Sequence, residues 1–135
     1  FENIMQSEQS HMNAVETLVK AYNIDYEILE EGQFGNEDLQ AWYDKFVTDG
    51  IVDEVAALTV GATIEDLDIV DLEENIQATS NSDIAEVFAS LQCGSRNHLR
   101  SFVQSLENSG ATYVPQFLTS EAFDVILDGA REQCN

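Results

Sequence analysis

The amino-acid sequence predicts an all-α fold on the basis of three observations. The chain of 135 residues contains only 1 Pro and 7 Gly, so few positions interrupt a helix. Along three long segments, apolar residues recur at alternating intervals of three and four positions, which is typical of a helix that buries one face. Stretches without a charge, such as residues 55–64, are too short to cross a bilayer, so we expect no membrane insertion.

The first predicted helix covers residues 1–22. Its inward-facing positions follow the spacing of three and four residues, and they are Ile4, Glu8, His11, Val15, Leu18 and Tyr22. Neither a capping residue nor a leader peptide precedes this helix. We therefore expect that a preceding helical element is missing from the chain or was removed by processing.

A connector over residues 23–35 is predicted to lead into a short helix. Asn36 is a suitable N-cap for this helix, which would extend to about Asp49 and end at Gly50. Its apolar side chains are Leu39, Trp42, Tyr43 and Phe46. Together they predict a short amphipathic helix that packs on the longer ones.

Two more long helices are predicted, over residues 52–78 and from Ser82 or Asp83 to about Asn108, with a polar loop between them. The inward positions of the first are Val55, Leu58, Ala62, Glu65, Ile69, Leu72 and Ile76. Those of the second are Ile84, Val87, Leu91, Gly94 or Ser95, His98, Phe102 and Leu106. After an extended stretch that contains Pro115, Thr119 or Ser120 is expected to cap a last short helix with Phe123, Ile126 and Leu127.

These elements predict one domain over residues 1–135, built from three members of a four-helix bundle whose first helix is absent or supplied elsewhere. Such a remnant would expose an apolar groove. We expect a second copy of the chain, or a segment of a partner, to cover this groove.

The two cysteines, Cys93 and Cys134, allow one intramolecular disulfide, which would hold the last short helix on the bundle. Two free thiols and an intermolecular bridge are the alternatives. With the missing leader, the pair favours a secreted, extracellular location.

The chain is strongly acidic, with 26 Asp and Glu, 5 Lys and Arg, and a net charge of −21. This charge excludes an electrostatic nucleic-acid binder. Eleven of the acidic residues lie between Phe46 and Gly94, where there is no Lys or Arg. We interpret them as a solvated helix face, with a cation-collecting surface or the docking site of a basic partner as alternatives. Arg96 and Arg100 are expected to pair with carboxylates of this acidic helix rather than to bind phosphate.

Four ionisable residues occupy positions where the neighbouring inward residues are apolar: Glu8, His11, Glu65 and His98. A buried ionisable group is costly unless it is paired or bound to a metal. Glu8 and His11 form Glu-x-x-His, which places a carboxylate and an imidazole on the same helix face. Oxygen and nitrogen donors of this kind suit iron, manganese or zinc. The alternative is a hydrogen-bonded Glu/His network without metal.

Three strings of the sequence resemble a known family: FENIMQSEQSHMNAVETLVKAY, TVGATIEDLDIVDLEENI and GSRNHLRSFVQSLENSGATYVPQFLTSEAFDVI. They are similar to the domain-of-unknown-function family 2202, a ferritin-like group. The resemblance implies a ferritin-like four-helix bundle with a metal site, in which an additional preceding helix contributes a further Glu. It also implies that Glu8 and His11 lie on the second bundle helix, Glu65 on the third and His98 on the fourth.

One position departs from the ferritin-like pattern, which would place a Glu three residues before His98. Ser95 stands there, and Asp68, one turn after Glu65, is a candidate replacement. The remaining donors suit one metal ion better than two, so a two-iron ferroxidase is not favoured. Two functions are therefore predicted. The first is a metal-binding bundle, and the second is a secreted acidic interaction module with a metal-free core.

Overall fold

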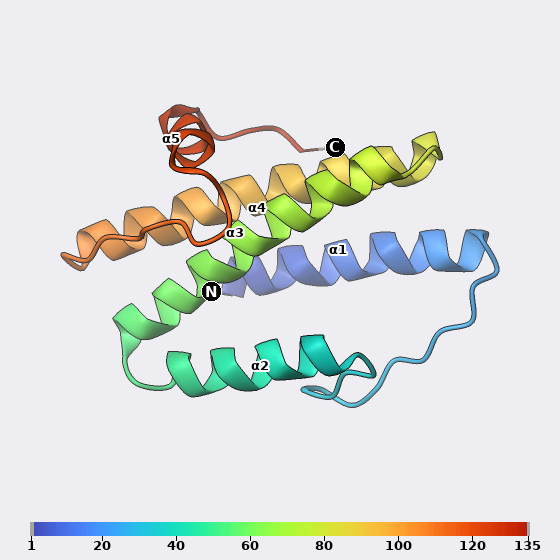
Figure 1. The fold of residues 1–135 in the computed structure, drawn as a ribbon, viewed down its shortest axis with the longest axis horizontal. Helices are drawn as coiled ribbons and strands as arrows, with labels where there is room; N and C mark the ends of the chain where they lie inside the picture. The colour runs from blue at the N-terminus through green and yellow to red at the C-terminus, as the bar shows by residue number, and fades with distance from the viewer. Residues whose placement is uncertain (1, 135) are drawn as a thin grey trace.

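The computed structural model describes residues 2–134, which contain five helices and no strand (Figure 1). The helices are α1 (Glu2–Ala21), α2 (Glu37–Gly50), α3 (Glu54–Ala78), α4 (Ser82–Asn108) and α5 (Ser120–Asp128). The predicted all-α class is confirmed, and each predicted helix is present. No helix in this range is both long and apolar enough to cross a membrane.

The core lies mainly between α3 and α4, which run side by side in opposite directions (Figure 1). The α5 helix and the segment before it cover one end of this pair. The buried cluster consists of Leu58, Ala62, Ile69, Leu99, Phe102, Val103, Leu106, Tyr113, Phe123 and Ile126. The predicted inward positions Leu58, Ala62, Glu65, Ile69 and Leu72 of α3, and Leu91, Ser95, His98, Phe102 and Leu106 of α4, are buried. The spacing of three and four residues therefore identified the buried faces of both helices correctly.

The α1 helix is less well covered than its apolar spacing predicts. Within the described residues its backbone approaches only α4, and Ile4 packs against the edge of the core. Val15 and Tyr22, predicted to face inward, are 37% and 40% exposed. Val55, near the start of α3, is also 37% exposed. A helix with one neighbour can bury only the side chains that face that neighbour.

Polar side chains cap three of the helices. The Asn36 side chain accepts hydrogen bonds from the first backbone N–H groups of α2, as its sequence position predicts. Asp53 does the same for α3, which begins at Glu54, two residues later than predicted. Thr119 caps α5. These caps satisfy backbone donors that a helix leaves without an internal partner.

The burial of Asp66 contradicts one part of the sequence interpretation. It belongs to the run of carboxylates interpreted as a solvated face, yet it is fully buried. Its Oδ2 accepts hydrogen bonds from Tyr113 Oη at 2.8 Å, from the Gln116 backbone N–H at 2.6 Å and from the Phe117 backbone N–H at 3.2 Å. Its Oδ1 accepts one from the Leu118 backbone N–H at 2.8 Å. Asp66 thus ties α3 to the extended segment that leads into α5.

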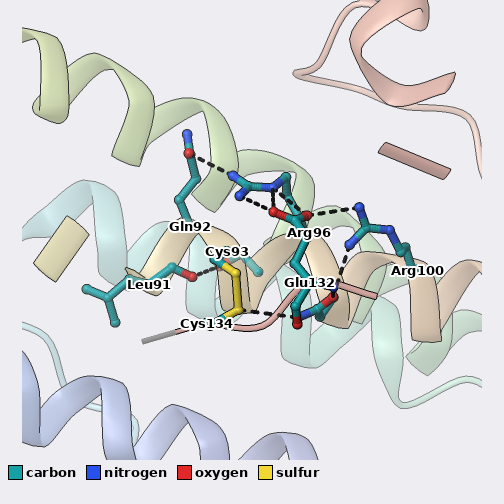
Figure 2. The surroundings of a disulfide bond; sticks show 9 residues. Leu91, Gln92, Cys93, Arg96, Arg100, Glu132 and Cys134 are labelled. Carbon is teal, nitrogen blue, oxygen red and sulfur yellow. Dashed lines mark hydrogen bonds and ion pairs between the residues drawn. A yellow bond between two sulfur atoms is a disulfide. The ribbon is translucent and has the colours of Figure 1, made fainter. Parts of the chain in front are cut away.

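The predicted intramolecular disulfide is present. Cys93 on α4 and Cys134 are bonded across a sequence separation of 41 residues, and both cysteines are used. The bond holds the segment after α5 against α4 (Figure 2).

Gly61 gives a direct test of the α3–α4 packing. A Cβ atom at this position would lie 2.5 Å from the ring of Phe102, closer than real contacts allow. Gly61→Ala is therefore expected to lower the free energy of unfolding by about 1–3 kcal/mol, although alanine favours helix formation by about 1 kcal/mol. Chemical denaturation measures the change. Gly35→Ala, where a Cβ meets nothing within 4 Å, is the control, and equal stability of the two variants would contradict this packing.

Candidate metal centre

The candidate centre is built around the imidazole of His98, which α4 directs toward α1 and α3. His98 Nδ1 lies 3.0 Å from Glu8 Oε1 and 3.2 Å from Glu65 Oε1. These three ligand atoms all lie within 4.8 Å of one another. The Nδ1 atom is buried and has no hydrogen-bond partner within residues 2–134, although both carboxylate oxygens lie at ion-pair distance. A nitrogen and two carboxylate oxygens therefore converge on one point.

Glu8 connects His98 to the second predicted histidine. Its other oxygen, Oε2, lies 3.0 Å from His11 Nδ1, and the two imidazole rings are 5.9 Å apart. Gly94 leaves room for the His11 ring. A Cβ atom at position 94 would lie 2.7–2.8 Å from this ring. The structure thus brings together all four predicted residues, although His11 reaches the group of three only through Glu8.

Asp68 of α3 and Ser95 of α4 form a hydrogen-bonded pair next to the cluster of Glu8, Glu65 and His98. Ser95 is buried, and its Oγ donates a hydrogen bond of 2.5 Å to Asp68 Oδ2. Asp68 does not belong to the group of ligand atoms that converges on His98. Where the ferritin-like pattern would have a second Glu, this chain has a serine hydroxyl bonded to a carboxylate from α3.

Burial and opposite charges act against each other in this cluster. Burial raises the pKa of Glu65, and the nearby Glu8 and Asp68 carboxylates add to this effect against the opposing influence of His98. Burial likewise raises the pKa of Asp68, against the hydrogen bond from Ser95. Both carboxyl groups therefore hold a proton more readily than they would in water.

The opposite balance holds for His98 and Glu8. Burial acts to lower the pKa of His98, but the carboxylates of Glu65 and Glu8 outweigh it and raise the pKa to about 9. Burial acts to raise the pKa of Glu8, but His11 and His98 outweigh it and lower the pKa to about 2. The Glu8 side chain is 47% exposed, so it forms the solvent side of the cluster. The site is an excess of carboxylate around one imidazole, which suits a cation.

A groove gives access to the cluster. It has a volume of about 1320 Å³ and lies between α1, α4 and residues 131–134, with both His11 and His98 among its lining residues. Most of its other walls are small or polar, including Ser7, Ser10 and Ser90. A hydrated ion or a small molecule can reach the imidazoles through this opening.

The prediction for Arg96 and Arg100 requires a correction. Both arginines form ion pairs with a carboxylate, as expected, but it belongs to Glu132 in the segment after α5 and not to the acidic helix α3. Helical periodicity could not single out Glu132, because this residue lies after α5 and outside any helix. The spacing of Cys93 and Cys134 was the available indication that this segment returns to α4.

The fold and the cluster define an all-α protein in which three helices direct glutamate and histidine side chains to one point. The chain belongs to the family described as Uncharacterized protein domain (DUF2202), which matches residues 1–130. The family predicted from the sequence is thereby confirmed.

A relative and its crystal structure support the same assignment. Uncharacterized protein MJ0754 from Methanocaldococcus jannaschii is 46% identical over 135 residues, which is 98% of this chain and 73% of that protein. The crystal structure of hypothetical protein MJ0754 from Methanococcus jannaschii matches with a TM-score of 0.94 and covers 98% of this chain and 77% of that chain. At this level of identity and structural agreement, the two chains share their helical fold.

Proposed function

We propose that this chain binds one divalent metal ion, iron, manganese or zinc, through Glu8, Glu65 and His98. The observation that carries this proposal is the buried His98 Nδ1, which faces two carboxylate oxygens without a hydrogen bond. Buried polar atoms without a partner are rare in folded proteins, and a bound ion is one explanation for them. Two carboxylates with one imidazole are donors that these three metals accept.

The residues around the three proposed ligands have supporting roles. His11 holds the second oxygen of Glu8 and so fixes the direction of that carboxylate. Asp68 lies close enough to influence Glu8 electrostatically. Its carboxylate accepts a hydrogen bond from Ser95, so we do not include it among the ligands. A bound ion would supply positive charge and, in the case of iron or manganese, redox chemistry. We propose that the bundle is ferritin-like with one cation rather than two, because serine replaces a second bridging carboxylate.

Metal analysis of matched variants tests this proposal. We expect protein purified without added metal, then titrated with Mn²⁺ or Zn²⁺, to bind one ion with a defined affinity. Glu65→Gln should weaken this binding by about 100-fold or more, because it removes a ligand charge from a buried position. Glu74→Gln makes the same chemical change on the exposed face of the same helix and should leave the affinity unchanged.

Two results would contradict the metal proposal. One is stoichiometric binding that survives Glu65→Gln and His98→Ala in folded protein. The other is equal loss of binding in Glu65→Gln and Glu74→Gln, which would place the ion on the diffuse acidic surface.

A second proposed function is self-association, because large apolar side chains are exposed on α1, on α2 and between them. Those more than 45% exposed include Met5, Met12, Ile24, Ile28, Leu39, Val47 and Ile51. Large apolar side chains exposed in this number favour a contact with another molecule. We propose that a second copy of the chain covers part of this surface.

The high charge makes the self-association testable by salt. Two chains of net charge −21 repel each other, and added salt screens this repulsion. We therefore expect sedimentation analysis to show a larger assembly whose population rises between low and physiological ionic strength. Met12→Glu should reduce the population of this assembly. Gln104→Glu, at an exposed position of α4, should have a smaller effect. A monomer at all ionic strengths and at high concentration would rule out this function.

A further inference from the structure

Residues 130–134 form an extended strap that lies along α4 after α5 ends (Figure 2). The Cys93–Cys134 disulfide fastens one end of the strap. Near its middle, Asn97 Nδ2 donates to the Glu132 carbonyl at 3.0 Å, and Asn97 Oδ1 accepts from the Glu132 N–H at 2.9 Å. No helix or sheet hydrogen bond holds the strap within residues 2–134, so these side-chain contacts keep it in place.

The Glu132 carboxylate lies between two arginines of α4 (Figure 2). Its Oε1 accepts hydrogen bonds from Arg96 Nε at 2.8 Å and from Arg100 Nη2 at 2.9 Å. Its Oε2 accepts from Arg96 Nη2 at 2.5 Å. Both oxygens of one carboxylate are therefore held by three guanidinium donors, which is a strong arrangement for this group.

The two arginines are held in position by groups that do not belong to the strap. Arg96 Nη1 donates to Gln92 Oε1 at 2.8 Å. Arg100 Nε donates to the Ile126 carbonyl at 2.8 Å, and its Nη1 donates to Asn97 Oδ1 at 3.0 Å. If the strap left, the guanidinium groups would keep these partners. Three donors would then still point toward the place that the carboxylate had occupied.

This pair of arginines is exceptional in the chain's charge distribution. The chain has 5 basic residues against 26 acidic ones, and Arg96, Arg100 and Arg131 are three of the five. Arg96 and Arg100 of α4 would therefore form a small positive region, once Glu132 leaves, in a molecule that is otherwise strongly negative. An anion that approaches the protein is repelled elsewhere and attracted here.

We propose that the strap is a removable internal ligand, and that Arg96 and Arg100 bind the carboxylate of an external molecule once the strap is released. The site binds Glu132 in the oxidised protein, so its fit to a carboxylate is shown by the chain's own side chain. This site is separate from the metal proposal, since neither arginine is a proposed ligand.

Release of the strap begins at the disulfide. Cys134 is exposed, whereas Cys93 is 8% exposed, so an external thiolate reaches the Cys134 sulfur more easily. A dithiol reductant forms a mixed disulfide with Cys134 and expels Cys93 as a thiolate, which takes up a proton. The second thiol of the reductant then displaces Cys134. Two protein thiols form, the dithiol becomes a disulfide, and two electrons pass from the reductant to the protein.

The disulfide controls the site through effective concentration. While the bond is closed, Glu132 is tethered two residues from Cys134, and it competes with any dissolved carboxylate at an effective concentration on the order of millimolar or higher. Opening the bond lets the strap leave α4. An external carboxylate can then replace Glu132 at the two arginines.

Nuclear magnetic resonance of the arginine Nε–H groups tests this proposal with acetate as the probe. We expect the Arg96 and Arg100 signals of a Cys93→Ser/Cys134→Ser/Glu132→Gln variant to shift saturably, with a Kd on the order of millimolar. The oxidised wild-type protein should need a clearly higher acetate concentration for the same shift, because the tethered Glu132 competes for the two arginines. Sodium chloride at equal ionic strength is the control for screening, and Cys93→Ser/Cys134→Ser/Glu121→Gln is the matched control for loss of an exposed carboxylate.

The same acetate titration of the reduced wild-type protein is a second test, and it needs no substitution. Its arginine signals should need more acetate for half-maximal shift than those of the Glu132→Gln variant, and less than those of the oxidised protein, because the untethered Glu132 still competes. The absence of a saturable shift in both folded proteins would overturn the proposal. Equal acetate binding by the oxidised wild-type protein would overturn it as well, since the strap would then mask nothing.

Discussion

Asp66→Ala is expected to lower the free energy of unfolding by about 3–5 kcal/mol, the largest single effect among the acidic residues. The change removes the acceptor of four hydrogen bonds, three of which come from the backbone N–H groups of Gln116, Phe117 and Leu118. The fourth comes from the buried hydroxyl of Tyr113. The Tyr113 hydroxyl is buried and the three backbone donors are partly buried, so the variant loses a charged acceptor that water replaces only in part.

Asp71→Ala is the matched control, because Asp71 is an exposed carboxylate on the same helix. Its effect should stay within about 0.5 kcal/mol. Urea denaturation followed by circular dichroism measures both variants. If they were equally stable, the segment between Tyr113 and Leu118 could not depend on Asp66 for its position.

Metal affinity is expected to rise about tenfold for each pH unit from pH 6.5 to pH 8.5 and to level off near pH 9. The reason is that the pKa of His98 is raised to about 9 in the free protein, so a proton occupies the imidazole at neutral pH. A metal ion must displace this proton, and lower pH strengthens the competition. Glu8, with a pKa lowered to about 2, stays ionised over the whole range and adds no slope.

Calorimetric titration with Mn²⁺ in two buffers of different ionisation enthalpy measures the protons released. At pH 7 we expect release of about one proton per ion bound. Glu74→Gln should keep the same pH slope. An affinity that did not change between pH 6.5 and pH 8.5 would show that the ion does not displace a proton from His98.

Much of the fold could be predicted from the sequence, because α3 and α4 bury continuous apolar faces that repeat every three to four residues. Ala62 and Ile69 on α3, and Phe102 and Leu106 on α4, are buried as that spacing indicates. Side-chain spacing gives the face of a helix but not the number of its neighbours. For this reason the exposure of Val15 on α1 could not be predicted.

The candidate site also contains residues that side-chain spacing could identify and residues that it could not. Glu8, His11, Glu65 and His98 could be singled out because each interrupts an apolar face, and the fold brings them together. Asp66 could not be separated from its acidic neighbours, because its four hydrogen-bond donors are distant in sequence. Long-range pairings of this kind depend on how loops pack, and helical periodicity carries no information about them.

The half-exposed position of Glu8 links the stability of α1 to the occupancy of the cluster. Within the described residues the backbone of α1 approaches only α4, yet α1 supplies one of the three converging ligand atoms. A ligand that requires Glu8 together with Glu65 and His98 binds only when α1 is docked, so it shifts the docking equilibrium by mass action. The linkage is reciprocal. A change that favours separation of α1 from α4 lowers the affinity for the ligand by the same factor. A ligand bound at the cluster would therefore stabilise the docking of α1 on α4.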